Sequence, residues 1–167
     1  MIKLINGRGQ LGQELKKQIN LFEKEINENI FIYHTWNIDD KSQQTQKNEY
    51  EKFLFFVDQN RNSRIIFTST YSTKENWYNH YKQLAAAYLI TNCTNGLVVR
   101  IPTIIGKGAV EKLKAGKIVP YGKFELITLQ RAAKEIINFL NYKGLIKIFT
   151  LEGEKISATT VKSLLEV

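Results

Sequence analysis

A tyrosine and a lysine stand four positions apart in the middle of the chain, within Asn76-Trp-Tyr-Asn-His-Tyr-Lys82. On a helix, residues at this spacing lie on one face, so Tyr78 and Lys82 would present their side chains together. An ammonium group beside a phenol stabilises the phenolate, which makes Tyr78 a candidate general acid or base. With eight tyrosines and many lysines, one such pair is also expected by chance. The position of the pair in the chain must therefore support its function.

Two hydroxyl residues precede the pair at the end of an apolar run. Ser69 and Thr70 follow Ile65-Ile66-Phe67, and the run predicts a buried strand over 64–68. Open α/β sheets bind their ligands beyond the carboxyl ends of the strands, where a hydroxyl could orient a substrate carbonyl. Successive residues of a strand face opposite sides, so we expect only one of the two hydroxyls to face the cleft.

A glycine-rich turn near the start of the chain has the spacing of a phosphate-binding loop. Gly7, Gly9 and Gly12 satisfy G-x-G-x-x-G and stand between an apolar strand predicted over 2–6 and a helix predicted over 13–19. Glycines in such a loop allow a tight turn, close approach of the backbone to a pyrophosphate and close packing of the helix. The helix N-terminus then faces the phosphate. The sequence therefore predicts a dinucleotide site at this turn.

The strand predicted over 30–35 ends without the acidic residue that normally holds an adenosine ribose. Tyr33, His34 and Thr35 occupy that place, and the next acidic residue is Asp39. We therefore interpret His34 as a strand-end residue near the ligand crevice, in preference to a ribose ligand or a catalytic base.

The remaining pattern alternates strands and helices. The expected strands cover 96–101, 117–119 and 146–151, and the expected helices cover 49–60, 109–113, 130–141 and a last segment from Ser157, with a first helix ending near 27–29 and a polar loop over 37–48. This alternation predicts an α/β fold, a reduced Rossmann-like parallel sheet with flanking helices. Because no linker divides the chain, we expect one domain over 1–167, with about 107–167 as a small substrate lobe. Trp36 and Trp77 flank the expected cleft, where packing is their expected role.

Composition narrows the class of protein further. The formal charge of +8 favours anionic partners, although lysines spread along the chain also describe a solubilising surface. One cysteine excludes an internal disulfide and fits a reducing compartment, and with only two histidines we expect no metal site. No leader segment and no apolar run of bilayer length is present, so we expect a cytoplasmic protein with no membrane contact.

Three motifs, taken in order, resemble the extended short-chain dehydrogenase/reductase family of NAD(P)-dependent sugar-nucleotide epimerases, dehydratases and reductases. Asn6-Gly-Arg-Gly-Gln-Leu-Gly12 is similar to the glycine loop of that family, and its last four residues are particularly similar to dTDP-4-dehydrorhamnose reductases. Ser69-Thr70 with Tyr78-x-x-x-Lys82 resembles the catalytic set. Val98-Val-Arg-Ile-Pro-Thr-Ile-Ile-Gly106 resembles the strand and loop that pass the nicotinamide, and Ile156-Ser-Ala-Thr-Thr-Val161 resembles a late helix of the substrate lobe.

The resemblance implies a role for each matching residue. Tyr78 would exchange a proton with a sugar carbonyl or hydroxyl, Lys82 would bind the nicotinamide ribose, and Ser69 or Thr70 would hold the substrate oxygen. NAD or NADP would be held by Lys82, by Pro102 and by the turn residues Gly7, Arg8, Gly9, Gln10, Leu11 and Gly12. Arg8 could meet a 2′-phosphate and favour NADP, but a solvated loop arginine explains it equally.

Members of this family are normally much longer, and the missing part can be located. The distance from Thr35 to Ser69 fits the family's spacing between its fourth strand and the catalytic serine. We therefore assign 30–35 as the fourth strand, which leaves the second and third strands, with the adenosine site, deleted. The short gap from Ser69 to Tyr78, Asn6 in place of a glycine and the reduced substrate lobe are further departures.

Two functions follow from these features. The first is an NAD(P)-dependent oxidoreductase or epimerase acting on a nucleotide-linked sugar or another anionic small molecule. The alternative is a degenerate, non-catalytic nucleotide- or protein-binding module that keeps the fold. The sequence leaves the oligomeric state open, and a homo-oligomer is compatible with both. Nucleic-acid binding is disfavoured because no readout motif is present.

Overall fold

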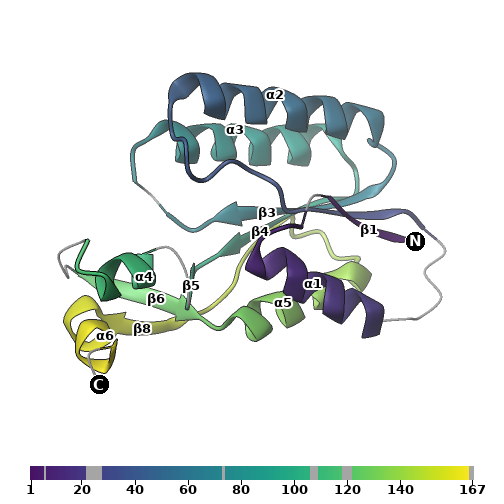
Figure 1. Cartoon of the computed structure of the whole chain (residues 1–167). Coiled ribbons are helices and arrows are strands. Elements are labelled where there is room, and N and C mark those ends of the chain that lie inside the picture. The colour runs from purple at the N-terminus through teal and green to yellow at the C-terminus, as the bar shows by residue number, and fades with distance from the viewer. Residues whose placement is uncertain (6, 22–27, 73, 106–108, 118–121, 166–167) are drawn as a thin grey trace.

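The fold is seen in a computed structural model that describes residues 1–5, 7–21, 28–72, 74–105, 109–117 and 122–165. Strands and helices alternate over most of this length (Figure 1). In chain order they are β1 Ile2–Ile5, α1 Gln10–Leu21, β2 Ile30–Tyr33, α2 Gln43–Gln59, β3 Arg64–Thr70, α3 Trp77–Asn92, β4 Gly96–Ile101, β5 Thr103–Ile104, α4 Ala109–Lys114, β6 Lys123–Ile127, α5 Leu129–Asn138, the 3₁₀ helix η1 Phe139–Asn141, β7 Ile148–Thr150, β8 Glu154–Ser157 and α6 Ala158–Leu165.

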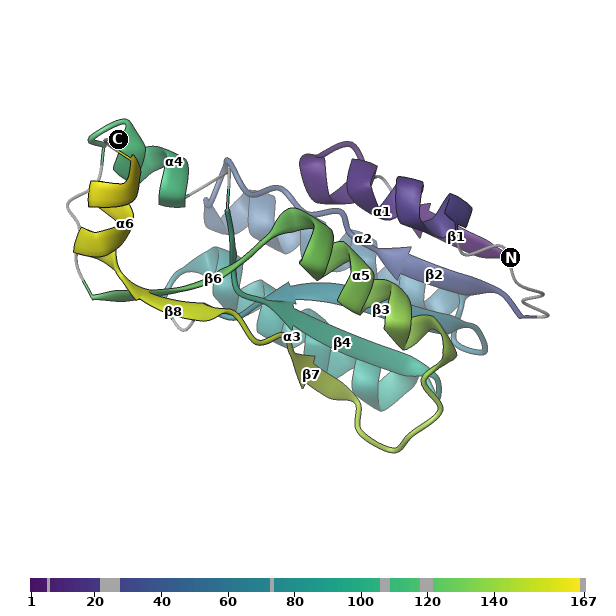
Figure 2. The ribbon, with the colours of Figure 1, turned by 90° about the horizontal axis from the view of Figure 1, so that it is seen from below.

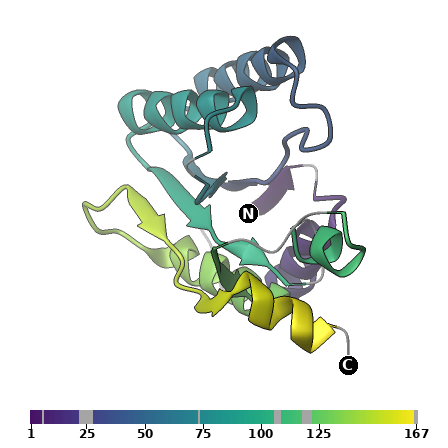
Figure 3. The ribbon, with the colours of Figure 1, turned by 90° about the vertical axis from the view of Figure 1, so that its left-hand side faces the viewer.

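The main sheet has five parallel strands in the order β1-β2-β3-β4-β7. Helices α2 and α3 cover one face, and α1 and α5 cover the other, as Figures 1 and 3 show from two directions. Parallel strands require helical crossovers, and a sheet covered on both faces needs apolar residues on both sides of each strand. Strand β3 meets this requirement, because its successive residues Ile65, Ile66 and Phe67 are apolar and fully buried.

Alternation along the strands divides the apolar side chains between two layers. Ile66 faces α1 and α5, whereas its neighbours Ile65 and Phe67 face α2 and α3. The first layer also contains Ile30, Ile32, Leu97 and Val99, and the second contains Phe31, Tyr33 and Val98. This predicted fold class, a parallel sheet with flanking helices, is confirmed.

Strand β2 lies between β1 and β3, with Ile30 opposite Ile2 on one side and opposite Arg64 on the other. A dinucleotide-binding sheet has the strand order 3-2-1-4-5-6, so removing its second and third strands leaves the first and fourth as neighbours. The observed order agrees with that deletion. Within the described residues, β1 is consequently the outer strand of the sheet.

Several predicted boundaries are wrong. The expected loop over 37–48 is helical from Gln43, because Ser42 accepts a hydrogen bond from the Thr45 amide and begins α2 six residues early. Strand β2 ends at Tyr33 and β7 covers only 148–150. The first helix is described as far as Leu21. Its end was predicted near 27–29, where residue 27 lies outside the described residues and Glu28 and Asn29 are not helical. Most of the strand predicted over 117–119 and the glycines at 106 and 108 also lie outside the described residues.

A second, smaller sheet was not predicted as a unit. It has the order β5-β6-β8, in which β6 and β8 are antiparallel, and both of these strands were missed. Helices α4 and α6 pack beside it around Val110, Leu113, Leu126 and Val161 (Figure 1). Ser157 accepts a hydrogen bond from the Thr160 amide, so its prediction as the cap of the last helix is confirmed. Helix α5 and strand β7, from the same third of the chain, pack on the main sheet instead.

Candidate functional site

The glycine turn joins β1 to α1 at the carboxyl end of the sheet. A side-chain carbon at Gly12 would lie 2.4 Å from the Gly7 Cα, so these two glycines allow the helix to pack directly on the turn. A side-chain carbon at Gly9 would meet no atom within 4 Å, and Gly9 is exposed. Gly7 and Gly12 therefore serve the packing of the fold, and Gly9 leaves space in which a ligand could approach the backbone.

The other turn residues divide in the same way. Leu11 is buried in the core between the sheet and α1, whereas Arg8 and Gln10 are exposed. The side-chain amide of Gln13 donates to the Arg8 carbonyl, and the Gln13 backbone amide donates to Gly9 at 2.9 Å. Helix α1 consequently begins at Gln10, three residues before the predicted start.

A cavity of about 400 Å³ lies beside this turn. Its walls come from the first half of α1, the start of α5 and Ile105 after β5, and they include Gln10, Glu14 and Thr128. Figure 2 shows α1 and α5 side by side. The cavity therefore lies between α1 and the start of α5, with Ile105 of the loop after β5 as part of its wall.

The tyrosine and the lysine lie in the first turns of α3, which begins after Asn76, whose side chain accepts a hydrogen bond from the Asn79 amide. Tyr78 is half-buried, and Lys82 is only 7% exposed. The Lys82 Nζ lies 5.4 Å from the centre of the Tyr78 ring and donates a 3.0 Å hydrogen bond to the Thr68 carbonyl of β3. The helix thus places the pair together, directly over the end of the strand that carries the hydroxyl residues.

Three aromatic rings surround the ammonium group of Lys82. Its Nζ lies 5.3 Å from the centre of Phe67, 5.5 Å from Trp36 and 5.4 Å from Tyr78. Rings at this distance attract a cation through their quadrupoles, and the attraction grows when water is excluded. We call these three rings the aromatic enclosure. A second ammonium, that of Lys41, lies 5.6 Å from the Tyr78 ring.

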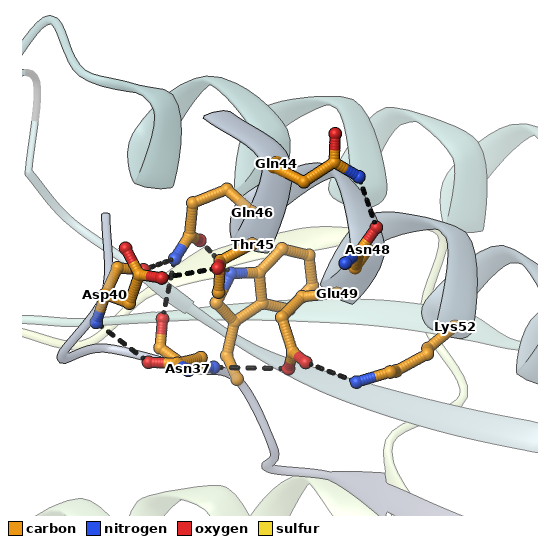
Figure 4. Close-up of polar contacts among 9 residues, drawn as sticks. Asn37, Asp40, Gln44, Thr45, Gln46, Asn48, Glu49 and Lys52 are labelled. Atoms are coloured by element: carbon orange, nitrogen blue, oxygen red, sulfur yellow. Dashed lines mark hydrogen bonds and ion pairs between the residues drawn. The ribbon is translucent and has the colours of Figure 1, made fainter. Parts of the chain in front are cut away.

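A buried glutamine holds the loop that carries Trp36. Gln46 is fully buried at the start of α2, and its side-chain oxygen accepts a 2.7 Å hydrogen bond from the Trp36 indole. Its amide donates to the backbone carbonyls of Asn37 and Asp40 (Figure 4). The same loop is fixed by the Asn37 side chain, which accepts from the Asp40 amide at 3.0 Å. Gln46 therefore joins the loop to the helix and sets the position of one wall of the enclosure.

The two candidate hydroxyls differ in their surroundings. Ser69 is buried, and alternation along β3 places it on the face of Phe67, which α3 covers and where Lys82 lies. Thr70 falls on the opposite face, and its hydroxyl accepts a 3.0 Å hydrogen bond from the Ser72 amide. The strand thus turns Ser69 toward the helix of Tyr78, whereas Thr70 supports the loop that follows.

His34, which follows β2, is hydrogen-bonded to the neighbouring strand β3. Its Nδ1 forms a 2.8 Å hydrogen bond with the Thr68 hydroxyl. Burial, helped by the nearby charge of Lys82, lowers the pKa of His34 to about 4, so the ring is neutral at pH 7. His34 and Lys82 therefore both contact Thr68, one through its hydroxyl and the other through its carbonyl.

Pro102 is buried between β4 and β5, where the main sheet passes into the second sheet. The fold therefore gathers the glycine turn, Ser69, Tyr78 and Lys82 at the carboxyl ends of the strands. Sequence reasoning missed Gln46 and Lys41 and assigned Trp36 only to packing. Their signal was weak, since all three stand in or beside a segment whose polar composition predicted a loop.

No known family profile matches the sequence, and no functionally curated protein matches it. Solved structures match it over nearly its whole length. A monomeric L-threonine 3-dehydrogenase from a metagenome database, in its apo form, has a TM-score of 0.74 at 11% identity over 98% of this chain and 80% of that chain. The Bordetella bronchiseptica enzyme WbmG in complex with NAD and UDP has 0.71 at 12% identity over 98% and 76%.

A dTDP-4-dehydrorhamnose reductase from Bacillus anthracis in complex with NADP also matches, with a TM-score of 0.71 at 14% identity over 99% of this chain and 81% of that chain. This chain has the fold of the NAD-dependent epimerase and dehydratase enzymes. Among its described helices, none combines the length and apolar character that a bilayer span requires.

Proposed function

We propose that this chain is an NAD(P)-dependent oxidoreductase or epimerase that acts on a nucleotide-linked sugar through Ser69, Tyr78 and Lys82. The observation that carries the proposal is the pairing of Tyr78 with a buried lysine over the carboxyl end of β3, on this fold. The open space at Gly9 supports the proposal that a cofactor pyrophosphate binds at the turn, where Gly7 and Gly12 pack closely together.

Each residue then has a distinct task. A bound nicotinamide supplies the hydride chemistry. The Tyr78 hydroxyl gives a proton to, or takes one from, the reacting sugar oxygen, and the Lys82 ammonium beside the ring stabilises the phenolate. Lys82 would also hold the nicotinamide ribose with the ammonium hydrogens that its bond to Thr68 leaves free. Ser69 orients the substrate oxygen, because it lies on the strand face that α3 covers.

The substrate class rests on charge and on the second sheet. A net charge of +8 favours an anionic ligand, and one matching enzyme was solved with UDP. We propose that β6, β8, α4 and α6 form the substrate lobe, because they stand at the carboxyl end of the main sheet next to the loop after β4 (Figure 1). A dehydrogenase of an amino acid shares the same fold, so the sugar is the finer part of this proposal.

A specific observation favours a second candidate, a non-catalytic module. The strands that hold an adenosine lie beyond the first strand of a dinucleotide-binding sheet, and no described strand lies beyond β1 here. Much of the cofactor's usual binding surface would then have to come from a partner chain, including a second copy. A module of this kind would bind a nucleotide weakly and would transfer no hydride.

One titration tests the proposal and the deletion together. NADH, NADPH and reduced nicotinamide mononucleotide are titrated side by side, with binding followed by nicotinamide fluorescence and by calorimetry. We expect saturable binding of a dinucleotide, and we expect the mononucleotide to bind within about tenfold of it, because the adenosine half meets little protein. Absence of any saturable binding at millimolar ligand contradicts the proposed function. A dinucleotide that binds more than about a hundredfold tighter than the mononucleotide contradicts the missing adenosine side.

A further inference from the structure

A buried arginine at the opposite end of the sheet has too few partners. Arg64 opens β3 and is 8% exposed. Its Nη2 donates a 2.6 Å hydrogen bond to the Phe139 carbonyl, and its Nε is buried without a partner. Among the residues that the structure describes, no carboxylate lies within ion-pair distance of it. A guanidinium has five N–H donors, so most of them have no acceptor among the residues that the structure describes.

The surroundings of Arg64 compensate its buried positive charge only in part. The carbonyl of Phe139 belongs to the carboxyl end of α5, whose partial negative charge favours a cation. Burial lowers the pKa of Arg64, and the charge of Glu28 acts in the opposite direction. Buried charges are normally paired and hydrogen-bonded, because one helix end does not replace the lost water. The guanidinium is therefore short of an anion.

A cavity of about 280 Å³ lies directly beside this arginine. Lys143 and Lys147, from the loop between η1 and β7, line it together with Arg64, and Glu28 is the one acidic residue among its walls. Gly96, at the amino end of β4, and Gly144 also line the cavity. Figure 2 shows this loop running past the amino end of β4.

We propose that this cavity binds a phosphate group. Three cations against one carboxylate give it a positive potential, and the planar fork of an arginine matches two oxygens of a phosphate. The volume suits a free phosphate or the phosphate of a mononucleotide, and it is small for a dinucleotide. The site lies at the amino ends of the strands, whereas the glycine turn and Tyr78 lie at their carboxyl ends. It is therefore independent of the function proposed above.

The test is a titration of the ¹⁵N-labelled full chain with inorganic phosphate at constant ionic strength, followed by amide chemical shifts. We expect saturable shifts at Gly96, Gly144 and Lys147. The dissociation constant should weaken about tenfold or more in Lys147→Gln, since it loses one charge-assisted contact, and should tighten in Glu28→Gln, since it loses the repelling carboxylate. Gly9→Val, at the other end of the sheet, should leave these shifts unchanged.

Arg64→Lys keeps the charge but removes the fork, so it should weaken phosphate binding while the helix-end contact keeps the chain folded. Because Lys147→Gln and Glu28→Gln change accessible residues, the proposal can be tested even if Arg64→Lys does not fold. A titration with AMP distinguishes the two sources of phosphate, since a nucleotide site binds AMP more tightly than phosphate. Shifts confined to the glycine turn, shifts that chloride reproduces, or equal affinity in all these variants would overturn the proposal and leave Arg64 as a helix cap.

Discussion

Replacement of Gly9 by valine separates ligand binding from folding. A side-chain carbon at Gly9 meets no atom within 4 Å, so the fold has room for valine. The Gly9 carbonyl accepts the first bond of α1, from the Gln13 amide, and valine is a poorer residue than glycine there. We therefore expect the free energy of unfolding to fall by about 1 kcal/mol or less. Dinucleotide binding should suffer far more, because the branched side chain occupies the space through which a pyrophosphate approaches the backbone.

The size of the loss follows from the contacts at stake. A hydrogen bond to a charged group contributes about 1.5–3 kcal/mol, so losing one bond to the pyrophosphate raises Kd about 10- to 150-fold. Fluorescence titration with NADH or NADPH measures Kd, and thermal unfolding followed by circular dichroism measures stability. Gly12→Ala is the matched control, because its new carbon would lie 2.4 Å from the Gly7 Cα and should cost about 1–3 kcal/mol of stability. If Gly9→Val binds the dinucleotide as well as the parent does, the turn is not the pyrophosphate site.

Three further perturbations follow from the site. The pKa of His34 is lowered from 6.5 to about 4. The free energy of unfolding should therefore be highest above pH 6.5, where the ring is neutral in both states, and should fall by up to about 3 kcal/mol as the pH drops toward 4. Urea unfolding at a series of fixed pH values measures this loss. Gln46→Leu removes three hydrogen bonds of a buried side chain, and we expect it to lower the free energy of unfolding by about 2–4 kcal/mol. It should also alter the tryptophan emission, because the Trp36 indole loses its hydrogen-bond partner. Ser69→Ala should reduce turnover about 10²-fold or more, whereas Thr70→Ala should change it less than tenfold, because only Ser69 shares the strand face that α3 covers.

Matched variants make each of these results interpretable. His80 is the other histidine and is exposed, so His80→Gln should leave the acid dependence unchanged while His34→Gln removes it. Gln44 is exposed, and its side-chain amide donates a hydrogen bond to Asn48 on the same helix, so Gln44→Leu should cost less than about 0.5 kcal/mol. An acid dependence that survives in His34→Gln, equal effects of the two glutamine changes, or a larger loss in Thr70→Ala would each contradict the corresponding assignment.

The main sheet could be predicted because its signals are local. The apolar runs Ile65-Ile66-Phe67 in β3 and Leu97-Val98-Val99 in β4 are uninterrupted, and the strand deletion was inferred from the spacing between Thr35 and Ser69, compared with the family that the sequence resembles. The second sheet could not be predicted in this way. Strand β6 pairs with β8 about 30 residues later, and neither segment has more than five residues, so their pairing depends on contacts that a short window of sequence does not contain.

The residues of the candidate site also differ in how far local sequence signals could predict their contacts. Tyr78 and Lys82 belong to one helix, so their spacing alone predicted that they would meet. Trp36 reaches Lys82 from a loop some 40 residues earlier, and Gln46 of α2 holds Trp36 by a hydrogen bond; the polar composition of that segment hid the start of α2. The sequence signal for this start was Ser42, because serine is a preferred N-cap residue and Ser42 caps α2. The aromatic enclosure is therefore a product of the tertiary fold.

If Tyr78 transfers a proton during hydride transfer, Tyr78→Phe must slow the chemical step itself, and single-turnover kinetics measures that step. The parent and the variant are mixed with reduced cofactor and a nucleotide-linked 4-keto sugar, and oxidation of the nicotinamide is followed by absorbance. Phenylalanine keeps the ring against the Lys82 ammonium and removes only the transferable proton. Because a general acid or base contributes about 10²- to 10⁴-fold, we expect a rate lower by that factor with cofactor affinity nearly unchanged. If the variant keeps more than about a tenth of the parental rate, Tyr78 is not the proton donor.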